Sequence, residues 1–168
     1  IKSGQKNKCI INSSKTNIKI NNLENGQDYK FKLLAKKNNS DKIIGKSPVR
    51  LAKAGLIPGK VINYIHPDDY TYSFSGRSPA SPSIAELPDG QYVASHDIYW
   101  GDAGQNLTKI FKSDDKGKTW RFVTDLYPCF WGKLFVHRDK LYMLATSTEY
   151  GSLLIGCSED GGETWSSP

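Results

Sequence analysis

An eight-residue motif occurs twice in this chain, and its repetition constrains the fold more than any other feature. Residues 113–120 read Ser-Asp-Asp-Lys-Gly-Lys-Thr-Trp, and residues 158–165 read Ser-Glu-Asp-Gly-Gly-Glu-Thr-Trp. Serine, aspartate, glycine, threonine and tryptophan recur at a single shift of 45 residues. Five identities at one shift indicate two copies of one structural unit.

The chemistry of the motif is that of a structured hairpin turn. Its aspartate can accept backbone N–H groups of the loop, its glycine can adopt a positive φ, and its tryptophan opens the next strand. A calcium loop is disfavoured, because the oxygen ligands are too few and no bidentate glutamate follows at the required spacing. We therefore expect no metal and no cofactor, and assign a structural role to Ser113, Asp115, Gly117, Trp120, Ser158, Asp160, Gly162 and Trp165.

The segments around the two motifs predict the same series of short strands twice. The first series covers residues 83–87, 91–95, 107–112 and 119–126, and the second covers 133–137, 140–145 and 152–157. Four short strands in about 40–50 residues are typical of one blade of a β-propeller. Because closure of a propeller takes about four to eight blades, we expect this chain to be part of a longer one.

The N-terminal part also predicts β structure. Residues 16–23 alternate apolar and polar side chains, a turn is expected at 24–27, and a strand at 28–35 places Tyr29 and Phe31 on one face. A polar loop at 36–47 and a shorter strand at 48–52 follow. The spacing from Leu23 through Gly26, Tyr29 and Phe31 to Ala35 resembles the second half of a fibronectin type III domain. The resemblance implies that the Tyr29 hydroxyl bonds back to the backbone upstream.

Charge and composition exclude several function classes. Residues 1–60 hold 14 Lys or Arg against 3 acidic residues, and residues 61–168 hold 9 against 14. The lysines alternate with apolar residues and do not cluster with stacking aromatics, so nucleic acid is not expected as a partner. No apolar run approaches the roughly 18 residues of a membrane span. Three cysteines without CxxC spacing predict neither a disulfide framework nor a zinc site.

The repeated Ser-x-Asp-x-Gly-x-Thr-Trp motif resembles the Asp-box of the sialidase (neuraminidase) superfamily. This resemblance implies an all-β fold: about two blades of a six-bladed sialidase-like propeller, preceded by the C-terminal half of a fibronectin type III-like sandwich. The expected divisions are a sandwich part at 1–54, a linker and lead-in segment at 55–80, and the blades at 81–168. In sialidases the boxes lie on the side away from the active site, so the loops between the second and third strands belong to the functional side.

Candidate site residues follow from this strand order and from the resemblance. Asp102 lies 18 residues before Trp120, where many sialidases carry their acid/base aspartate, and Asp97 is its rival. Ala80 stands where the family has its first substrate-binding arginine, and Arg77 lies three residues earlier. The catalytic candidates are Asp102 and Asp97, and the substrate-binding candidates are Arg77, His96, Trp100, Trp131, Glu149 and Tyr150.

Two functions are predicted from these features. The first is a part, inactive by itself, of a secreted exo-acting, sialidase-like glycoside hydrolase that cleaves terminal sugars from glycans, outside the cell or at its surface. The second is a non-catalytic propeller that binds glycans or proteins through the same loops. A different carbohydrate-active propeller with His96 or His137 as a base is a further alternative.

Overall fold

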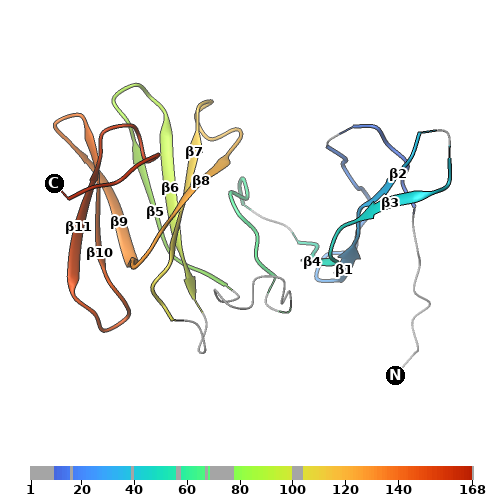
Figure 1. Cartoon of the computed structure of the whole chain (residues 1–168), viewed down its shortest axis with the longest axis horizontal. Coiled ribbons are helices and arrows are strands. Elements are labelled where there is room, and N and C mark those ends of the chain that lie inside the picture. Colours follow the sequence, from blue (N-terminus) through green and yellow to red (C-terminus); the bar gives the residue numbers. More distant parts are fainter. Residues whose placement is uncertain are drawn as a thin grey trace.

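The chain is all-β in the parts that the structure, a computed structural model, describes. These parts are residues 10–15, 17–38, 40–55, 58–66, 68, 78–99 and 104–167. Within them all regular structure is strand, and no helix is long and apolar enough to cross a membrane. Figure 1 shows the strands β5–β11 side by side and the strands β1–β4 apart from them. The all-β prediction is confirmed.

The first copy of the repeat forms a four-stranded antiparallel sheet in chain order. Each strand pairs with its neighbour in sequence, and the expected strands are all present. Their bounds are β5 (Ser78–Glu86), β6 (Tyr92–Tyr99), β7 (Thr108–Ser113) and β8 (Arg121–Leu126). This up-and-down order is the order of strands within a propeller blade.

The second copy repeats this sheet. Its strands are β9 (Phe130–His137), β10 (Lys140–Thr146) and β11 (Leu153–Ser158). Ser166 then forms an isolated antiparallel bridge with Cys157. In the first sheet Arg121 pairs with Lys112 in the same way, and both pairs are related by the shift of 45 residues. The repeat therefore extends from the motif to the register of the strands.

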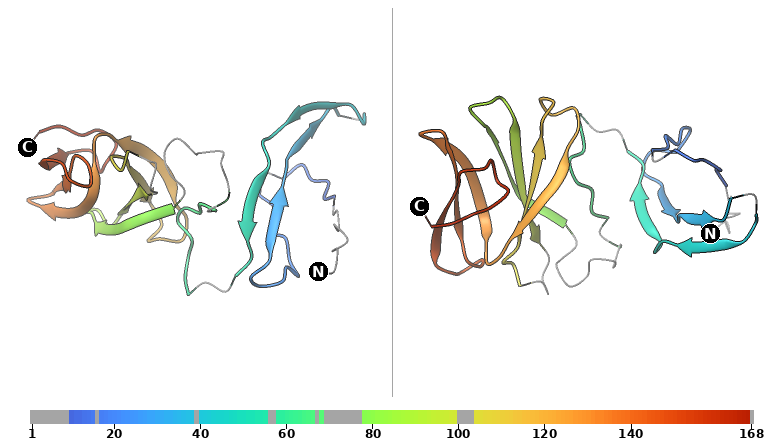
Figure 2. Two further views of the ribbon diagram at one scale, coloured as in Figure 1. Left: turned by 90° about the horizontal axis from the view of Figure 1, so that it is seen from below. Right: turned by 45° about the horizontal axis from the view of Figure 1, so that its top comes forward.

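The hydrophobic core lies between these two sheets, which Figure 2 shows from two further sides. Val93 and Ile110 of the first sheet pack with Leu141 and Met143 of the second, and each is at most 3% exposed. The first strands of the two sheets are also adjacent, because the backbone N–H of Leu134 donates to the Ser83 hydroxyl at 2.9 Å. Consecutive propeller blades pack face to face in this manner.

The first box, residues 113–120, is a turn held by side-chain hydrogen bonds. The Ser113 hydroxyl accepts from the Gly117 N–H (2.8 Å) and donates to Asp115 (2.8 Å). Asp115 also accepts from the backbone N–H (2.7 Å) and the hydroxyl (2.6 Å) of Thr119. Gly117 has φ +83°, and its carbonyl accepts from the Trp120 indole N–H at 3.1 Å. The serine, aspartate and glycine thus satisfy the backbone of a tight turn.

The second box, residues 158–165, repeats this network. Asp160 accepts from the Ser158 hydroxyl (2.8 Å) and from both the N–H and the hydroxyl of Thr164. Gly162 has φ +98°, and its carbonyl accepts from the Trp165 indole at 3.0 Å. Both box tryptophans are half-buried, and Trp165 packs against the core between the sheets.

The box aspartates predict sensitivity to acid. Hydrogen bonds, first from the Thr119 hydroxyl, lower the pKa of Asp115 to about 2. At Asp160 partial burial opposes the shift, but the hydrogen bonds from Thr164 and Ser158 still lower the pKa to about 2. A depressed carboxyl pKa adds stability above the unfolded value of 3.8, and this stability is lost as the pH falls toward about 2.

We therefore expect the urea midpoint to fall between pH 3.8 and about 2, and the fall to be smaller in the Asp115→Asn/Asp160→Asn double variant. Urea unfolding at a series of pH values measures this difference. Asp114→Asn, in the same turn but outside the network, is the matched control and should follow the wild type. An equal fall of the urea midpoint with pH in the wild type and in the double variant would contradict a stabilising role of the box aspartates.

The N-terminal part forms two short hairpin-like pairs. Its strands are β1 (Asp28–Phe31), β2 (Leu34–Lys36), β3 (Ile43–Lys46) and β4 (Arg50–Lys53), with β1 paired to β4 and β2 paired to β3. The Tyr29 hydroxyl accepts the backbone N–H of Glu24 at 2.8 Å, which is the bond that the fibronectin resemblance predicts. Gly26 takes φ +79° in the expected turn.

Three strand predictions in this part were wrong. The described residues 17–23 form no strand, since no neighbouring strand pairs with them. The expected strand 28–35 is divided, because pairing changes from β4 to β3 where Leu33 and Ser47 exchange hydrogen bonds. β3 itself lies inside the segment predicted as a polar loop. Alternation alone therefore located the β structure but not its pairing.

Candidate functional site

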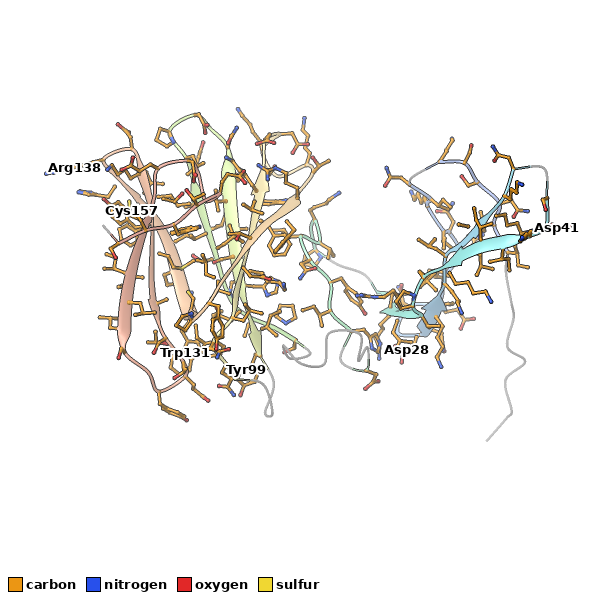
Figure 3. The ribbon with its side chains drawn as sticks, in the orientation of Figure 1. Asp28, Asp41, Tyr99, Trp131, Arg138 and Cys157 are labelled. Atoms are coloured by element: carbon orange, nitrogen blue, oxygen red, sulfur yellow. The ribbon has the colours of Figure 1, made fainter. Side chains whose placement is uncertain are left out.

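Antiparallel order separates the connections of both sheets into two ends. The site end comprises the β6–β7 loop, the β8–β9 connection and the β10–β11 loop, whereas the box end comprises the two boxes and the β5–β6 and β9–β10 turns. Figure 3 shows Trp131 and Tyr99 at one end and Arg138 at the other. The candidate residues of the site end are thus separated from the boxes by the length of the strands.

The β10–β11 loop presents Glu149 and Tyr150 on a compact turn. The Ser147 N–H donates to the Ser152 carbonyl at 2.9 Å, and the Gly151 N–H donates to Thr148 at 3.1 Å. A Cβ at Gly151 would lie 2.7 Å from the Thr148 nitrogen, so only glycine fits there. Glu149 is half-buried, whereas Tyr150 at the tip is 91% exposed. The loop therefore offers one carboxylate and one aromatic ring to solvent.

Trp131 is another aromatic residue that the site end exposes, beside Tyr127 (72% exposed) and Tyr150. It directly follows Phe130, which is fully buried, and it is itself 46% exposed with φ +54°. The Phe130 ring stacks against Tyr99 at 6.5 Å and contacts Trp131 at 5.6 Å between centroids. Tyr99, 39% exposed at the end of β6, was not among the predicted site residues. Its position at a strand end was the available signal.

Asp97 lies below this aromatic group and is fully buried. One carboxylate oxygen accepts from the Thr108 hydroxyl at 2.5 Å, and the other accepts from the Trp131 N–H at 2.7 Å. Burial is the largest influence on its titration and raises the pKa of Asp97, although these hydrogen bonds oppose it. Both oxygens of this predicted catalytic candidate are thus engaged inside the protein.

His96 lies on the opposite face of the first sheet. It is 7% exposed and stacks on Phe111 at 5.5 Å. Its Nδ1 donates to the Asp97 carbonyl at 2.9 Å, and its Nε2 accepts from the Asn63 amide at 2.9 Å. Burial lowers the pKa of His96, so the ring is neutral at pH 7. The predicted substrate-binding His96 is therefore not brought together with Trp131 or Glu149.

The structure does not describe all of the remaining predicted site residues. Arg77, Trp100 and Asp102 lie outside the described residues. Of the arginines that are described, Arg121 pairs with Glu163 at the box end, Arg138 occupies the β9–β10 turn, and Arg50 belongs to β4. Over the described ranges the site end thus carries no guanidinium, and no cluster of His, Cys, Asp or Glu could hold a metal ion.

A groove of about 400 Å³ lies between the β8–β9 connection and the second sheet. Its lining is largely apolar and includes Cys129, Met143, Ile155 and Trp165. In the first sheet β8 occupies the equivalent place beside β7, as the shared register shows. The groove therefore corresponds to the position of a fourth strand and is not a candidate ligand site.

Comparisons with known proteins give structural likeness only. No family model matches the chain, and no curated protein does. A solved α-L-arabinanase of Penicillium chrysogenum with arabinobiose is 21% identical, with a TM-score of 0.46 over 61% of this chain and 33% of its own. An α-L-arabinofuranosidase of Fusarium graminearum with arabinobiose is 18% identical, with a TM-score of 0.48 over 62% and 34%.

A third solved structure is the sialidase of Trypanosoma rangeli. It is 19% identical, with a TM-score of 0.41 over 82% of this chain and 21% of its own. These three solved structures are thus glycoside hydrolases of different kinds, and the chain spans about a third of the length of the first two and about a fifth of the sialidase. At these identities no residue role is transferred from them.

Proposed function

We propose that this chain is part of a glycoside hydrolase that acts on terminal sugars of glycans, with its site at the site end. The observation that carries the proposal is that two exposed aromatic residues, Trp131 and Tyr150, and the half-buried Glu149 all lie at the end opposite the boxes. Aromatic rings pack against the apolar faces of sugars, and a few convergent polar groups orient a ligand.

The proposed chemistry needs a carboxyl pair. Glycoside hydrolases protonate the leaving oxygen with one acid and use a second group as base or nucleophile. Glu149 and Asp102 occupy equivalent loops of the two sheets, which makes them the proposed carboxyl groups. Sialic acid as the sugar depends on an arginine clamp, for which Arg77 is the proposed first member. An arabinose-type or other neutral sugar requires no such clamp.

The proposed architecture extends beyond two sheets. The outer face of the second sheet exposes Leu144 (41%), Leu153 (73%) and Ile155 (49%), which suits a further blade. We therefore propose a closed propeller. We also propose that the protein is extracellular or lies at the cell surface, where a hydrolase of glycans meets its substrate. The Tyr29–Glu24 hydrogen bond supports a fibronectin-like unit over residues 1–54, joined by a lead-in segment at 55–80.

The second candidate is a binding module without catalysis. One observation favours it: Asp97, a catalytic candidate predicted from the sequence, has both oxygens bound inside the protein. Within the described segments, Glu149 is then the one carboxyl group of the site end that is proposed to act on a substrate.

Assays on the full protein separate the two candidates. Hydrolysis of aryl α-L-arabinofuranosides and aryl sialosides should be measured beside calorimetric binding of arabinobiose and sialyllactose. Turnover of either substrate supports the hydrolase, and binding without turnover supports the binding module. Neither turnover nor binding of any of these probes would contradict both.

A further inference from the structure

Trp131 holds a backbone conformation that a large side chain rarely adopts. Its φ of +54° lies in the left-handed region, where a bulky residue persists only when its surroundings determine the conformation. The Trp131 ring is 46% exposed and contacts Phe130 at 5.6 Å between centroids, so only one part of the residue is held by its own packing. Something beneath the residue must fix its backbone.

Hydrogen bonds from three strands restrain the segment that ends at Trp131. The Thr108 hydroxyl on β7 shares its one proton between Asp97 (2.5 Å) and the Cys129 carbonyl (3.0 Å). The Thr146 hydroxyl on β10 donates to the Phe130 carbonyl (3.1 Å). The Trp131 N–H itself donates to Asp97 on β6 at 2.7 Å. Each residue from 129 to 131 thus has one backbone group bound to a side chain of a sheet.

The repeat shows that a carboxyl group is not required by the sheet at this position. Asp97 pairs with Thr108 in the first sheet, and Thr146 pairs with Leu153 in the second. Since Thr108 and Leu153 are related by the 45-residue shift, Asp97 is equivalent to Thr146. A fully buried carboxyl group is unfavourable unless it is hydrogen-bonded to specific partners. Thr146 donates to the Phe130 carbonyl, whereas Asp97 accepts from the Trp131 N–H, so the carboxyl group makes a bond that its counterpart does not make.

We propose that Asp97 is a positioning residue, which binds the Trp131 N–H and so fixes the exposed indole at the site end. It acts through Trp131 and Thr108 and does not itself touch a ligand, because no part of it is exposed. This role replaces the acid/base role considered for Asp97. The inference rests on the proposed function only in the assumption that Trp131 contacts a glycan.

The test compares Asp97→Ala with Asp97→Asn in the full chain by amide hydrogen exchange of Trp131, resolved by NMR. Asn retains an oxygen for the Trp131 N–H, and its amide can donate to the Thr108 hydroxyl, so exchange should stay close to wild type. Ala removes the acceptor, so the Trp131 amide should exchange at least about ten-fold faster. Ser95→Ala is the control, because Ser95 lies on the same strand, is buried, and has a hydroxyl without a partner in the described structure.

Faster exchange in Asp97→Ala alone supports the proposal, and unchanged exchange overturns it. If Asp97→Ala does not fold, Thr108→Val should still accelerate Trp131 exchange, since it removes the hydroxyl that bonds Asp97; unchanged exchange there overturns the proposal.

A second readout uses arabinobiose and sialyllactose. Asp97→Ala should weaken the affinity as much as Trp131→Ala, with no further loss in the double variant. If the wild type binds neither probe, the proposed function fails while the exchange result still decides the role of Asp97. Loss of hydrolysis in Asp97→Asn with normal Trp131 exchange would instead restore the acid role.

Discussion

Ile110→Ala should destabilise the chain by about 2–5 kcal/mol, the range measured for truncation of buried aliphatic side chains. Ile110 is fully buried, and it packs between the two sheets with Val93 and Leu141. The substitution removes three carbons and leaves a cavity where both sheets meet. Urea unfolding at neutral pH measures the loss. The same m-value, the dependence of the unfolding free energy on urea concentration, is used for both proteins.

Ile155→Ala is the matched control for this prediction. Ile155 is the same residue at the equivalent place of the second copy, but it lies on the outer face and is 49% exposed. Its truncation should cost about 1 kcal/mol or less. Equal losses for the two variants would show that the core does not lie between the sheets as described.

Trp131→Ala should weaken glycan binding roughly 30-fold, the effect of losing about 2 kcal/mol at a central aromatic contact. The unfolding free energy should change by less than about 1 kcal/mol, because the indole is 46% exposed and is not part of the buried core cluster between the sheets. Calorimetry with arabinobiose and sialyllactose, together with a urea titration of the same samples, measures both quantities.

Trp120→Ala should show the reverse pattern. Trp120 lies in the first box, where its indole N–H bonds to the Gly117 carbonyl, so its loss should reduce stability and leave affinity unchanged. A loss of affinity in Trp120→Ala together with normal binding by Trp131→Ala would contradict the assignment of the two ends.

The repeat allowed much of the fold to be predicted, because its signals are local. The serine, aspartate and glycine of each box satisfy backbone groups within the same turn, so their spacing in sequence is their spacing in space. Strands joined by such short turns pair with their neighbours, which makes sheet order readable from the chain. The all-β fold and the strands of both sheets were predicted for this reason.

Features that depend on distant residues were not predictable from the sequence. The burial of Asp97 depends on Trp131, 34 residues later in the chain, and nothing local to either residue indicates their hydrogen bond. The positive φ of Trp131 is likewise not a preference of a large side chain, and the hydrogen bonds around it come from residues distant in sequence. The same limit explains the wrong strand bounds at residues 28–36, whose pairing partners β3 and β4 lie in later segments.

The most direct test of the functional proposal is a map of glycan contacts by NMR. Amide shifts of the isotope-labelled chain should be followed while arabinobiose, and separately sialyllactose, is added. We expect the shifted amides to lie at the site end, in residues 97–99, 127–132 and 147–152. Shifts confined to the two boxes and to the β9–β10 turn, or no shifts with either sugar, would contradict a glycan site at the site end.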